Sequence, residues 1–316
     1  MKRVKVFIDG SEGTTGLRIN ERFEGREDIE VLHIDPELRK DPDERRKMIN
    51  ASDYTFLCLP DAAAIEAVSL VENKETVVID ASTAHRTLPD WAYGLPELSK
   101  ELHDKIKSSK RIAVPGCYAS GFVMNAYPLV KGGILAEDYP FAVSALSGYS
   151  GAGKKTIAVY EDAGKTNDLF APRQYALTQQ HKHLKEMKAI VGLTTEPIFI
   201  PVIDDYYCGM IVNLPIHARL MKKRLSPEEL REYLAFYYKD QPFIRVCEYG
   251  KEAEYNGFLA ANAIAGKDYA LIYVTGCEER IVVSAVFDNL GKGASGAAVE
   301  CMNVSMGIAP ETGLQI

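Results

Sequence analysis

Short apolar runs separated by polar, glycine-containing turns dominate the first third of the chain. Periodicity and flanking turn residues predict strands over four of these runs, at 4–8, 30–34, 54–59 and 76–79. A loosely helical pattern follows the first run, and a second helix is expected from Asp61 to about Val71. Strands that alternate with helices predict a parallel, doubly wound sheet.

The pattern changes beyond about residue 140, where strand-like runs follow one another. These runs lie at 141–146, 197–203, 207–219, 246–248, 270–275 and 280–287. One helix is expected among them, with Ser226 as N-cap, Pro227 at the first helical position and an end at Tyr238. Small residues from Asn289 onward precede a last helix through Met306. This half predicts an α+β domain with a mostly antiparallel sheet.

The predicted fold class is therefore α/β, with two domains. Residues 1–115 form a Rossmann-like dinucleotide-binding domain, which a C-terminal helix within 292–316 completes. Residues 116–291 are expected to form the α+β domain. A chain of 316 residues is long enough for two such cores.

A glycine-rich turn joins the first strand to the first helix. Gly10, Gly13 and Gly16 are spaced G-x-x-G-x-x-G, and Ser11 occupies the position of the first glycine of the usual dinucleotide fingerprint. Glycines permit a tight turn and close approach of a pyrophosphate to the helix N-terminus. The strand–turn–helix context favours a dinucleotide site over an ordinary glycine turn.

The residues after the second strand leave the cofactor open. Asp35 lies about 20 positions beyond the glycines, where an acidic residue binds the ribose of NAD. Arg39 and Lys40 follow and could meet the 2′-phosphate of NADP, or simply belong to a solvated loop.

Further polar residues follow the carboxyl ends of predicted strands, where ligands gather on parallel sheets. The turn at Pro60 and the loop from Ser82 to Arg86 lie there. Arg86 could clamp an anion bidentately, although a single loop arginine is more often a surface residue. His85 is interpreted as structural.

Cys117 follows a strand-like run and a Pro-Gly break, at the start of a helical pattern from Ala119 to Val130. Unpaired amides and the dipole at a helix N-terminus favour the thiolate, which is a strong nucleophile. The alternative is a small buried cysteine where strand meets helix.

Two further stretches contain candidate chemistry. Residues 147–156 resemble a P-loop, but Lys155 stands where a magnesium-binding Ser or Thr is required, so an anion site is expected and not an NTPase. His181 and His183 are poorly spaced for joint metal binding, and no third ligand is evident, so one of them is expected to act as acid or base. Spacing does not decide which, and two solvent-facing histidines are the alternative.

Composition excludes several function classes. The net charge is −7 and no Lys/Arg block appears, so nucleic-acid binding is not expected. The 6 cysteines are widely spaced and favour a reducing compartment. Neither a signal peptide at Met1–Val4 nor an apolar run of the ~20 residues that span a bilayer is seen. The expected protein is cytoplasmic and binds no membrane and no metal.

Together these segments resemble N-acetyl-γ-glutamyl-phosphate reductase in its shorter form, within the aspartate-semialdehyde-dehydrogenase-like superfamily. The resemblance covers essentially the whole chain. Its most specific parts are Asp-Ala-Ser-Thr-Ala-His-Arg at 80–86, Tyr-Gly-Leu-Pro-Glu-Leu at 93–98 and Pro-Gly-Cys-Tyr-Ala at 115–119. It implies NADPH-dependent reduction of an acyl phosphate to N-acetylglutamate semialdehyde, a step of arginine biosynthesis.

The resemblance also implies that residues 116–291 are the catalytic and dimerisation domain, and it implies roles for single residues. Cys117 matches the nucleophile that forms a thioester, and His181 matches the acid/base. The expected substrate contacts are Arg86, Ser147, Ser150, Gly151, Tyr175, His183 and Glu186. The implied cofactor is NADP, and its expected contacts are Gly10, Ser11, Gly13, Thr14, Thr15, Gly16, Arg39, Pro60, Ser82 and Asn289.

Two rival functions remain at this point. One is an aspartate-semialdehyde dehydrogenase, against which the Pro-Gly-Cys context and the His-x-His motif speak. The other is a non-catalytic dinucleotide-binding regulatory protein. A small-molecule acyl phosphate is the expected substrate, and relatives suggest a homo-oligomer, either a dimer or a tetramer.

Overall fold

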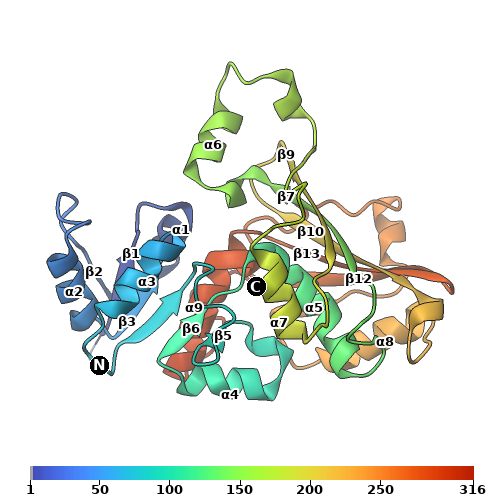
Figure 1. Cartoon of the computed structure of the whole chain (residues 1–316), viewed down its shortest axis with the longest axis horizontal. Coiled ribbons are helices and arrows are strands. Elements are labelled where there is room, and N and C mark those ends of the chain that lie inside the picture. Colours follow the sequence, from blue (N-terminus) through green and yellow to red (C-terminus); the bar gives the residue numbers. More distant parts are fainter. Residues whose placement is uncertain (1–2) are drawn as a thin grey trace. The chain divides into compact units, whose positions relative to one another are not determined.

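The computed structural model describes residues 3–316, which form two compact units (Figure 1). The first unit comprises the chain up to Pro115 together with Ala294–Leu314. The second comprises Gly116–Gly293 and the last two residues. Met1 and Lys2, which belong to the stretch where no signal peptide is expected, lie outside the described residues.

A six-stranded sheet forms the centre of the first unit, and all of its neighbouring strands are parallel. In spatial order the strands are β2 (Ile29–Leu32), β1 (Val4–Asp9), β3 (Tyr54–Leu57), β4 (Val77–Asp80), β6 (Arg111–Ala113) and β5 (Ala92–Tyr93). The helices of this unit are α1 (Thr14–Phe23), α2 (Pro42–Ala51), α3 (Asp61–Ser69), α4 (Lys100–Ser108) and α9 (Gly296–Met306), with a short 3₁₀ turn at Pro96–Leu98.

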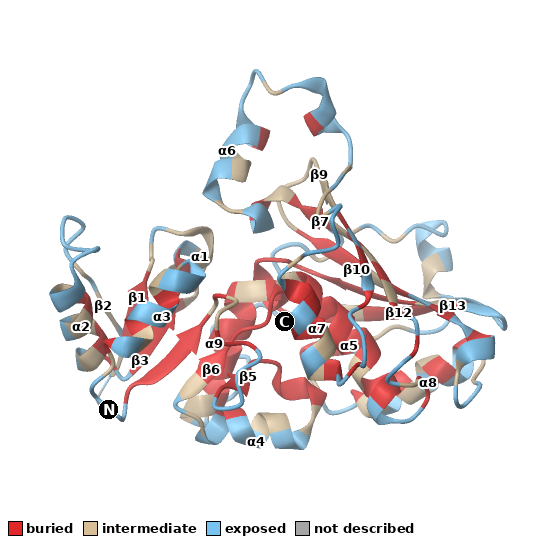
Figure 2. Cartoon of the chain, viewed as in Figure 1, coloured by how far each residue is buried: buried red, intermediate tan, exposed pale blue. Residues whose placement is uncertain are grey.

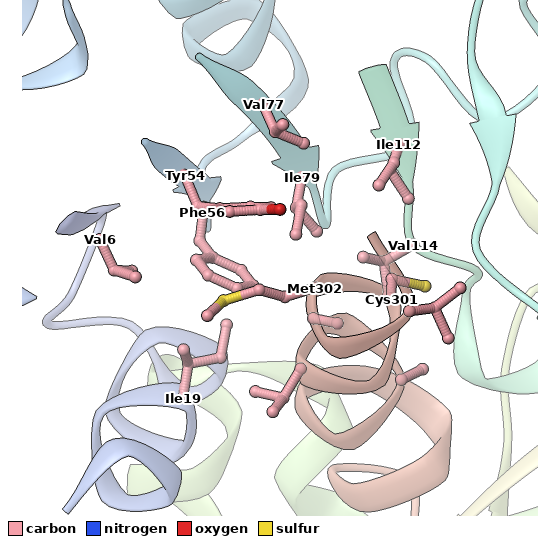
Figure 3. Close-up of a cluster of buried hydrophobic side chains, with 14 of the residues drawn as sticks. Val6, Ile19, Tyr54, Phe56, Val77, Ile79, Ile112, Val114, Cys301 and Met302 are labelled. Carbon is pink, nitrogen blue, oxygen red and sulfur yellow. The ribbon is translucent and has the colours of Figure 1, made fainter. Parts of the chain in front are cut away.

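Helices cover both faces of this sheet. Ile19 of α1 and Met302 of α9 pack with Phe56 of β3 on one face (Figure 3). Ile49 of α2 packs in the cluster of Phe7 of β1 on the other. Successive side chains of a strand point to opposite faces, so a strand covered on both sides becomes an almost uninterrupted apolar run. The expected doubly wound parallel sheet is confirmed.

The second unit contains a seven-stranded mixed sheet. Its spatial order is β11 (Ile244–Val246), β12 (Ala270–Cys277), β13 (Arg280–Phe287), β10 (Met210–His217), β7 (Ala142–Gly148), β9 (Ile198–Asp204) and β8 (Arg173–Gln174). The β11–β12 and β7–β9 pairs are parallel and the other neighbouring pairs are antiparallel. The expected mostly antiparallel sheet is confirmed.

The α-helices of the second unit are α5 (Cys117–Lys131), α6 (Lys154–Glu161), α7 (His183–Val191) and α8 (Pro227–Tyr237). Shorter turns of this unit lie at Tyr149–Ala152, Asn167–Phe170, Ala218–Leu220 and Lys251–Tyr255, and a further turn at Gly291–Ser295 precedes α9. The expected cap of α8 is confirmed, because Ser226 and Glu229 form a reciprocal capping box and Pro227 is the first helical residue.

Helix α5 packs closely on the middle of the seven-stranded sheet. A Cβ at Gly121 would lie 2.5 Å from Cγ2 of Val212 in β10, so glycine permits this approach. Asn125 Nδ2 donates to the carbonyl oxygens of Val212 (3.0 Å) and Val283 (3.2 Å). These bonds hold α5, and the cysteine at its first position, on the strands β10 and β13.

Most residues of the segment around α6 are exposed or half-buried (Figure 2). Its main anchor is Tyr160, which stacks on Tyr149 with ring centroids 4.8 Å apart. Lys165 adds an ion pair with Asp205 at 2.6 Å.

Element boundaries differ from the expected ones by a few residues. The second strand ends at Leu32 and not at Ile34, and β10 begins at Met210 and not at residue 207. Helix α5 begins at Cys117 itself, two residues before the predicted Ala119. Each difference occurs at an element end, where hydrogen bonding and not side-chain pattern decides the boundary.

Candidate active site

The glycine turn of the first unit lies where β1 gives way to α1. The strands that follow β1 pair on opposite sides of it, so the strand order reverses there, at the position where doubly wound sheets bind nucleotides. Gly13 N–H donates to the Gly10 carbonyl oxygen at 2.9 Å and closes the turn. Gly13 is then the N-cap residue of α1.

Neighbouring backbone atoms exclude a side chain at Gly10 and at Gly16. Gly10 has φ +88°, and a Cβ there would overlap the carbonyl oxygen of Cys58. A Cβ at Gly16 would lie 2.5 Å from the Gly10 carbonyl oxygen. The chain therefore turns tightly at these two glycines into a ten-residue helix, whose N-terminal amides suit a pyrophosphate.

The other proposed cofactor residues of this unit follow neighbouring strands. Pro60 is the N-cap of α3 after β3, and Ser82 follows β4. The Ser82 hydroxyl donates to Asp80 Oδ2 at 2.7 Å. Arg39 is exposed in the turn after β2. These residues share the carboxyl-end edge of the sheet, while Asn289 belongs to the second unit.

A buried ion pair that the sequence did not reveal lies directly before the glycine turn. Asp9 ends β1, and its Oδ2 accepts from Arg45 Nε of α2 at 3.0 Å. Burial raises the pKa of the Asp9 carboxyl, and the Arg45 guanidinium opposes that shift. Arg45 also bonds Glu66 of α3 at 2.7 Å, so it joins α2 and α3 to the end of β1.

Substitution of Gly10 by alanine is expected to raise the dissociation constant of NADP at least about tenfold, because the new Cβ displaces the turn from Cys58. The matched control is Gly25→Ala. Gly25 also has positive φ (+78°), but no atom lies within 4 Å of its Cβ position. Fluorescence titration with NADP measures both. Equal affinities in the two variants would contradict a cofactor site at this turn.

Arg86 and His85 support the polar loop after β4 in the first unit. Arg86 is buried and donates to the carbonyl oxygens of Val114 (2.8 Å) and Ala81 (3.0 Å). His85 Nδ1 lies 2.6 Å from Asp80 Oδ2, and its ring stacks on Trp91. The structural interpretation of His85 is confirmed.

In the second unit, Cys117 is the first residue of α5 and is partly exposed. Gly116 is the N-cap, and its N–H donates to Glu186 Oε1 of α7 at 2.9 Å. A Cβ at Gly293 would lie 3.0 Å from the Cβ of Cys117, so a glycine lets that segment pass beside the cysteine. The helix N-terminus stabilises negative charge on the sulfur.

Aromatic and imidazole rings gather beside Cys117. The His181 ring contacts Tyr118, Tyr175 and Phe199 at centroid distances of 6.2, 5.9 and 5.2 Å. His183 lies 4.6 Å from His181. The structure thus brings Cys117, Tyr175, His181, His183 and Glu186, all proposed from the sequence, to the adjoining ends of α5 and α7.

One hydrogen bond distinguishes the two histidines. The backbone N–H of His183 donates to His181 Nδ1 at 3.2 Å. An N–H needs an acceptor, so this bond assigns the proton of the neutral His181 ring to Nε2. His181 is partly exposed, whereas His183 is buried at the first position of α7.

The two tyrosines of this cluster are held in the neutral form. Burial raises the pKa of Tyr118 well above its usual value, and negative charge on Tyr175 and Cys117 would raise it further. Burial also raises the pKa of Tyr175, and the Cys117 charge adds to that shift. Sequence reasoning assigned no role to Tyr118, although its place next to Cys117 was a signal.

The loop that delivers Tyr175 and His181 is fixed to β9. Gln179 donates through Nε2 to the Phe199 carbonyl (2.8 Å) and accepts through Oε1 from the Phe199 N–H (2.9 Å). Ala176 and Gln179 both have left-handed backbone, with φ of +53° and +57°. Such conformations cost energy in residues other than glycine and gather at functional sites.

The expected anion loop follows β7. Ser147 and Ser150 are buried, whereas Gly151 is exposed. The Ser147 hydroxyl donates to the Gly148 carbonyl at 3.0 Å, and Ser150 Oγ accepts from Asn289 Nδ2 at 2.9 Å. Helix α6 begins shortly afterwards at Lys154.

Within residues 3–316, no group of three or more His, Cys, Asp or Glu side chains is arranged to hold a metal ion. No helix of the described chain is long and apolar enough to cross a membrane.

Comparison with known proteins defines the class first. The chain matches the family profile "Semialdehyde dehydrogenase, NAD binding domain" over residues 4–106, and "Semialdehyde dehydrogenase, dimerisation domain" over residues 117–289. Among solved structures, aspartate semialdehyde dehydrogenase II from Vibrio cholerae has a TM-score of 0.72 at 16% identity, over 97% of this chain and 99% of that chain. The Francisella tularensis enzyme has a TM-score of 0.71 at 15% identity, over 95% and 99%. These structures establish the fold.

Curated relatives narrow the class. N-acetyl-gamma-glutamyl-phosphate reductase 2 from a Nostoc species is 41% identical, over 99% of this chain and all of its own length. The Burkholderia lata reductase is 41% identical over 98% of both chains, and reductase 2 of Pseudomonas putida is 41% identical over 96% of both. The chain belongs to the N-acetyl-γ-glutamyl-phosphate reductase family of semialdehyde dehydrogenases.

Proposed function

We propose that this protein reduces N-acetyl-γ-glutamyl phosphate to N-acetylglutamate semialdehyde and phosphate with NADPH, through a thioester on Cys117. The observation that supports this mechanism best is Cys117 at the N-terminus of α5, in one cluster with His181 and Tyr175. Family membership supports the reaction, and it does not favour aspartate semialdehyde as substrate.

Cys117 acts as the nucleophile. Its thiolate attacks the acyl-phosphate carbonyl carbon, a C–S bond forms, and the carbon–oxygen bond to phosphate breaks as phosphate leaves. The helix N-terminus stabilises the thiolate, both before it attacks the substrate and after the aldehyde leaves. Amides of the first turn of α5 lie beside the sulfur and are suited to hold the oxyanion of the substrate.

NADPH, when bound, supplies the hydride that reduces the thioester carbonyl. His181 donates the proton on its Nε2 to the carbonyl oxygen as negative charge develops there. It takes the proton back when the C–S bond breaks, so that the aldehyde leaves and the thiolate is restored. The His183 amide holds the His181 ring in this tautomer.

The cofactor is NADP, and the first unit would hold it at its carboxyl-end edge. The proposed contacts are Gly10, Ser11, Gly13, Thr14, Thr15, Gly16, Arg39, Pro60 and Ser82, together with Asn289 of the second unit. The glycine turn fits the pyrophosphate because it leads the backbone tightly into the N-terminus of α1. Exposed Arg39 is the proposed partner of the 2′-phosphate.

The substrate's two anionic ends need donors. We propose Ser147, Ser150 and Gly151 for this role because their loop is exposed at Gly151 and leads into the N-terminus of α6. Arg86 is proposed as a further anion ligand. Tyr175, His183 and Glu186 are proposed to line the substrate site around His181.

A homo-oligomer is proposed from one open face of the seven-stranded sheet. Ile198 and Ile200 of β9 are 61% and 38% exposed, and alternation places them on the face opposite the buried Phe199. Pro215 of β10 is exposed on the same face. A second copy of the chain would cover this face, so light scattering is expected to give the mass of two or four chains.

The reverse reaction tests the proposed function. NADPH formation is followed from NADP, phosphate and N-acetylglutamate semialdehyde, with aspartate semialdehyde and NAD as parallel controls. Phosphate-dependent signal with the acetylated aldehyde and NADP is the expected result. Signal with aspartate semialdehyde instead would move the protein to the sister activity. Silence with both aldehydes, from folded protein that still binds NADP, would favour a non-catalytic dinucleotide-binding protein.

A further inference from the structure

We propose that Asn289 is a positioning residue that sets the direction in which the Ser150 hydroxyl donates, so that this hydroxyl meets an oxyanion of the substrate. The inference deepens the proposed function and rests on it, because it concerns the same anion loop. It is based on two hydrogen bonds in series, in which the fixed donor role of one group determines the role of the next group.

The first bond orients the Asn289 amide. Gly209 N–H donates to Asn289 Oδ1 at 2.8 Å. A backbone N–H can only donate, so the atom that faces it must be the oxygen and not the nitrogen of the carboxamide. Asn289 is 1% exposed, which leaves water little access to compete for these bonds.

The second bond orients Ser150. With its oxygen toward Gly209, Asn289 presents Nδ2 to Ser150 Oγ at 2.9 Å. A hydroxyl has one hydrogen to donate and lone pairs that accept. Asn289 uses a lone pair, so the Ser150 hydrogen must point elsewhere. Within residues 3–316 no acceptor takes that hydrogen, although Ser150 is 1% exposed and buried donors are normally satisfied.

A glycine stands beside these groups. Gly151 is exposed, and a side chain there would begin 2.9 Å from Asn289 Nδ2 and 3.9 Å from Ser147 Oγ. Because residue 151 is glycine, no side chain of its own covers them. A phosphoryl or carboxylate oxygen placed near it would meet donors that the protein's own structure has already aligned.

The loop itself is held rigidly in this position. Gly148 N–H bonds the Gly209 carbonyl, and Ser150 N–H bonds the Tyr207 carbonyl, both at 2.9 Å. Asn289 follows β13 and lies 139 residues from Ser150 in the sequence. Its amide therefore joins the end of β13 to the ends of β7 and β10, and places the Ser150 hydroxyl relative to all three.

The test is a double-mutant cycle with Ser150→Ala and Asn289→Ala in the reverse reaction. The measured quantities are the KM values for inorganic phosphate and for N-acetylglutamate semialdehyde, and the dissociation constant of NADP. Each single variant is expected to raise the KM of the same probe about tenfold, as for loss of a hydrogen bond to a charged group. The double variant is expected to lose no more than either single one. The probe whose KM rises tells whether Ser150 meets the phosphoryl or the carboxylate group.

Two results would overturn the proposal. Multiplicative losses in the double variant would mean that Asn289 does not act through Ser150. A raised dissociation constant for NADP with unchanged KM values would make Asn289 a cofactor contact only. Asn289→Asp serves as a second variant if the alanine form does not fold. It keeps the acceptor for Gly209 but takes the Ser150 hydrogen for itself, so it is also expected to raise the KM.

A calorimetric measurement tests the role of Asn289 even if the proposed reaction does not occur. If the wild-type protein turns over neither aldehyde, the proposed activity fails. Titration with inorganic phosphate and with N-acetylglutamate then replaces the KM values. A tenfold weaker binding in both single variants would still support the role of Asn289, and unchanged binding would refute it.

Discussion

Replacement of Cys117 by serine is expected to lower kcat/KM by at least about a thousandfold, as for removal of a catalytic nucleophile. A serine hydroxyl remains protonated near neutral pH, even at a helix N-terminus, whereas a thiol is far more acidic and a helix N-terminus favours its thiolate. The exchange hardly changes side-chain size, so α5 and its packing on β10 and β13 should persist. Initial rates of the reverse reaction measure the loss, and NADP titration checks that the first unit is unaffected.

The control for this variant is Cys277→Ser. Cys277 is exposed at the end of β12, and backbone amides of Glu279 and Arg280 lower the pKa of its thiol. It is thus a second ionisable cysteine outside the ring cluster. Its loss should leave kcat/KM within about twofold. If Cys117→Ser retained a tenth or more of the activity, or if Cys277→Ser caused the loss, the covalent mechanism on Cys117 would be wrong.

Replacement of His181 by alanine is expected to lower kcat about 10²- to 10⁴-fold, the usual contribution of a positioned acid/base group. His183→Ala is the informative comparison, because alanine keeps the backbone N–H but removes the neighbouring imidazole. Its effect on kcat should be smaller than that of His181→Ala. His103→Ala, at an exposed position of α4, is the control without expected effect.

Steady-state rates with saturating aldehyde and phosphate rank the three histidine variants. If His183→Ala were the more damaging substitution for kcat, proton transfer would belong to His183. If His181→Ala changed only the KM values, the ring would bind substrate without moving a proton.

Much of the fold follows from local sequence patterns. Buried strands such as β3 are apolar throughout because helices cover both faces of their sheet. The Ser226 cap and the Pro227 start of α8 were predictable because a cap involves neighbours only three residues apart. Family resemblance, carried by motifs near Cys117 and Arg86, identified the reaction class that the comparisons support.

The spacing of the two histidines did not decide which of them transfers the proton. The sequence gives no reason to prefer His181 or His183 as the acid or base, because both side chains have the same chemistry. The folded chain distinguishes them through burial of His183 and through the bond from its N–H to His181 Nδ1. That bond depends on the backbone conformation before α7, which Gln179 holds on β9.

By itself, the sequence determined the alternation of strands and helices, the glycine turn after β1 and the placement of a cysteine at a helix start. These features depend on residues adjacent in the chain, whose propensities act locally. Only the tertiary structure decided which distant side chains contact these features. Glu186 meets Gly116 across 70 residues, and Asn289 meets Ser150 across 139. Such bonds form when packing brings separate elements together and buries polar groups that then need hydrogen-bond partners. No local sequence pattern predicts them, because the partners are far apart in the chain.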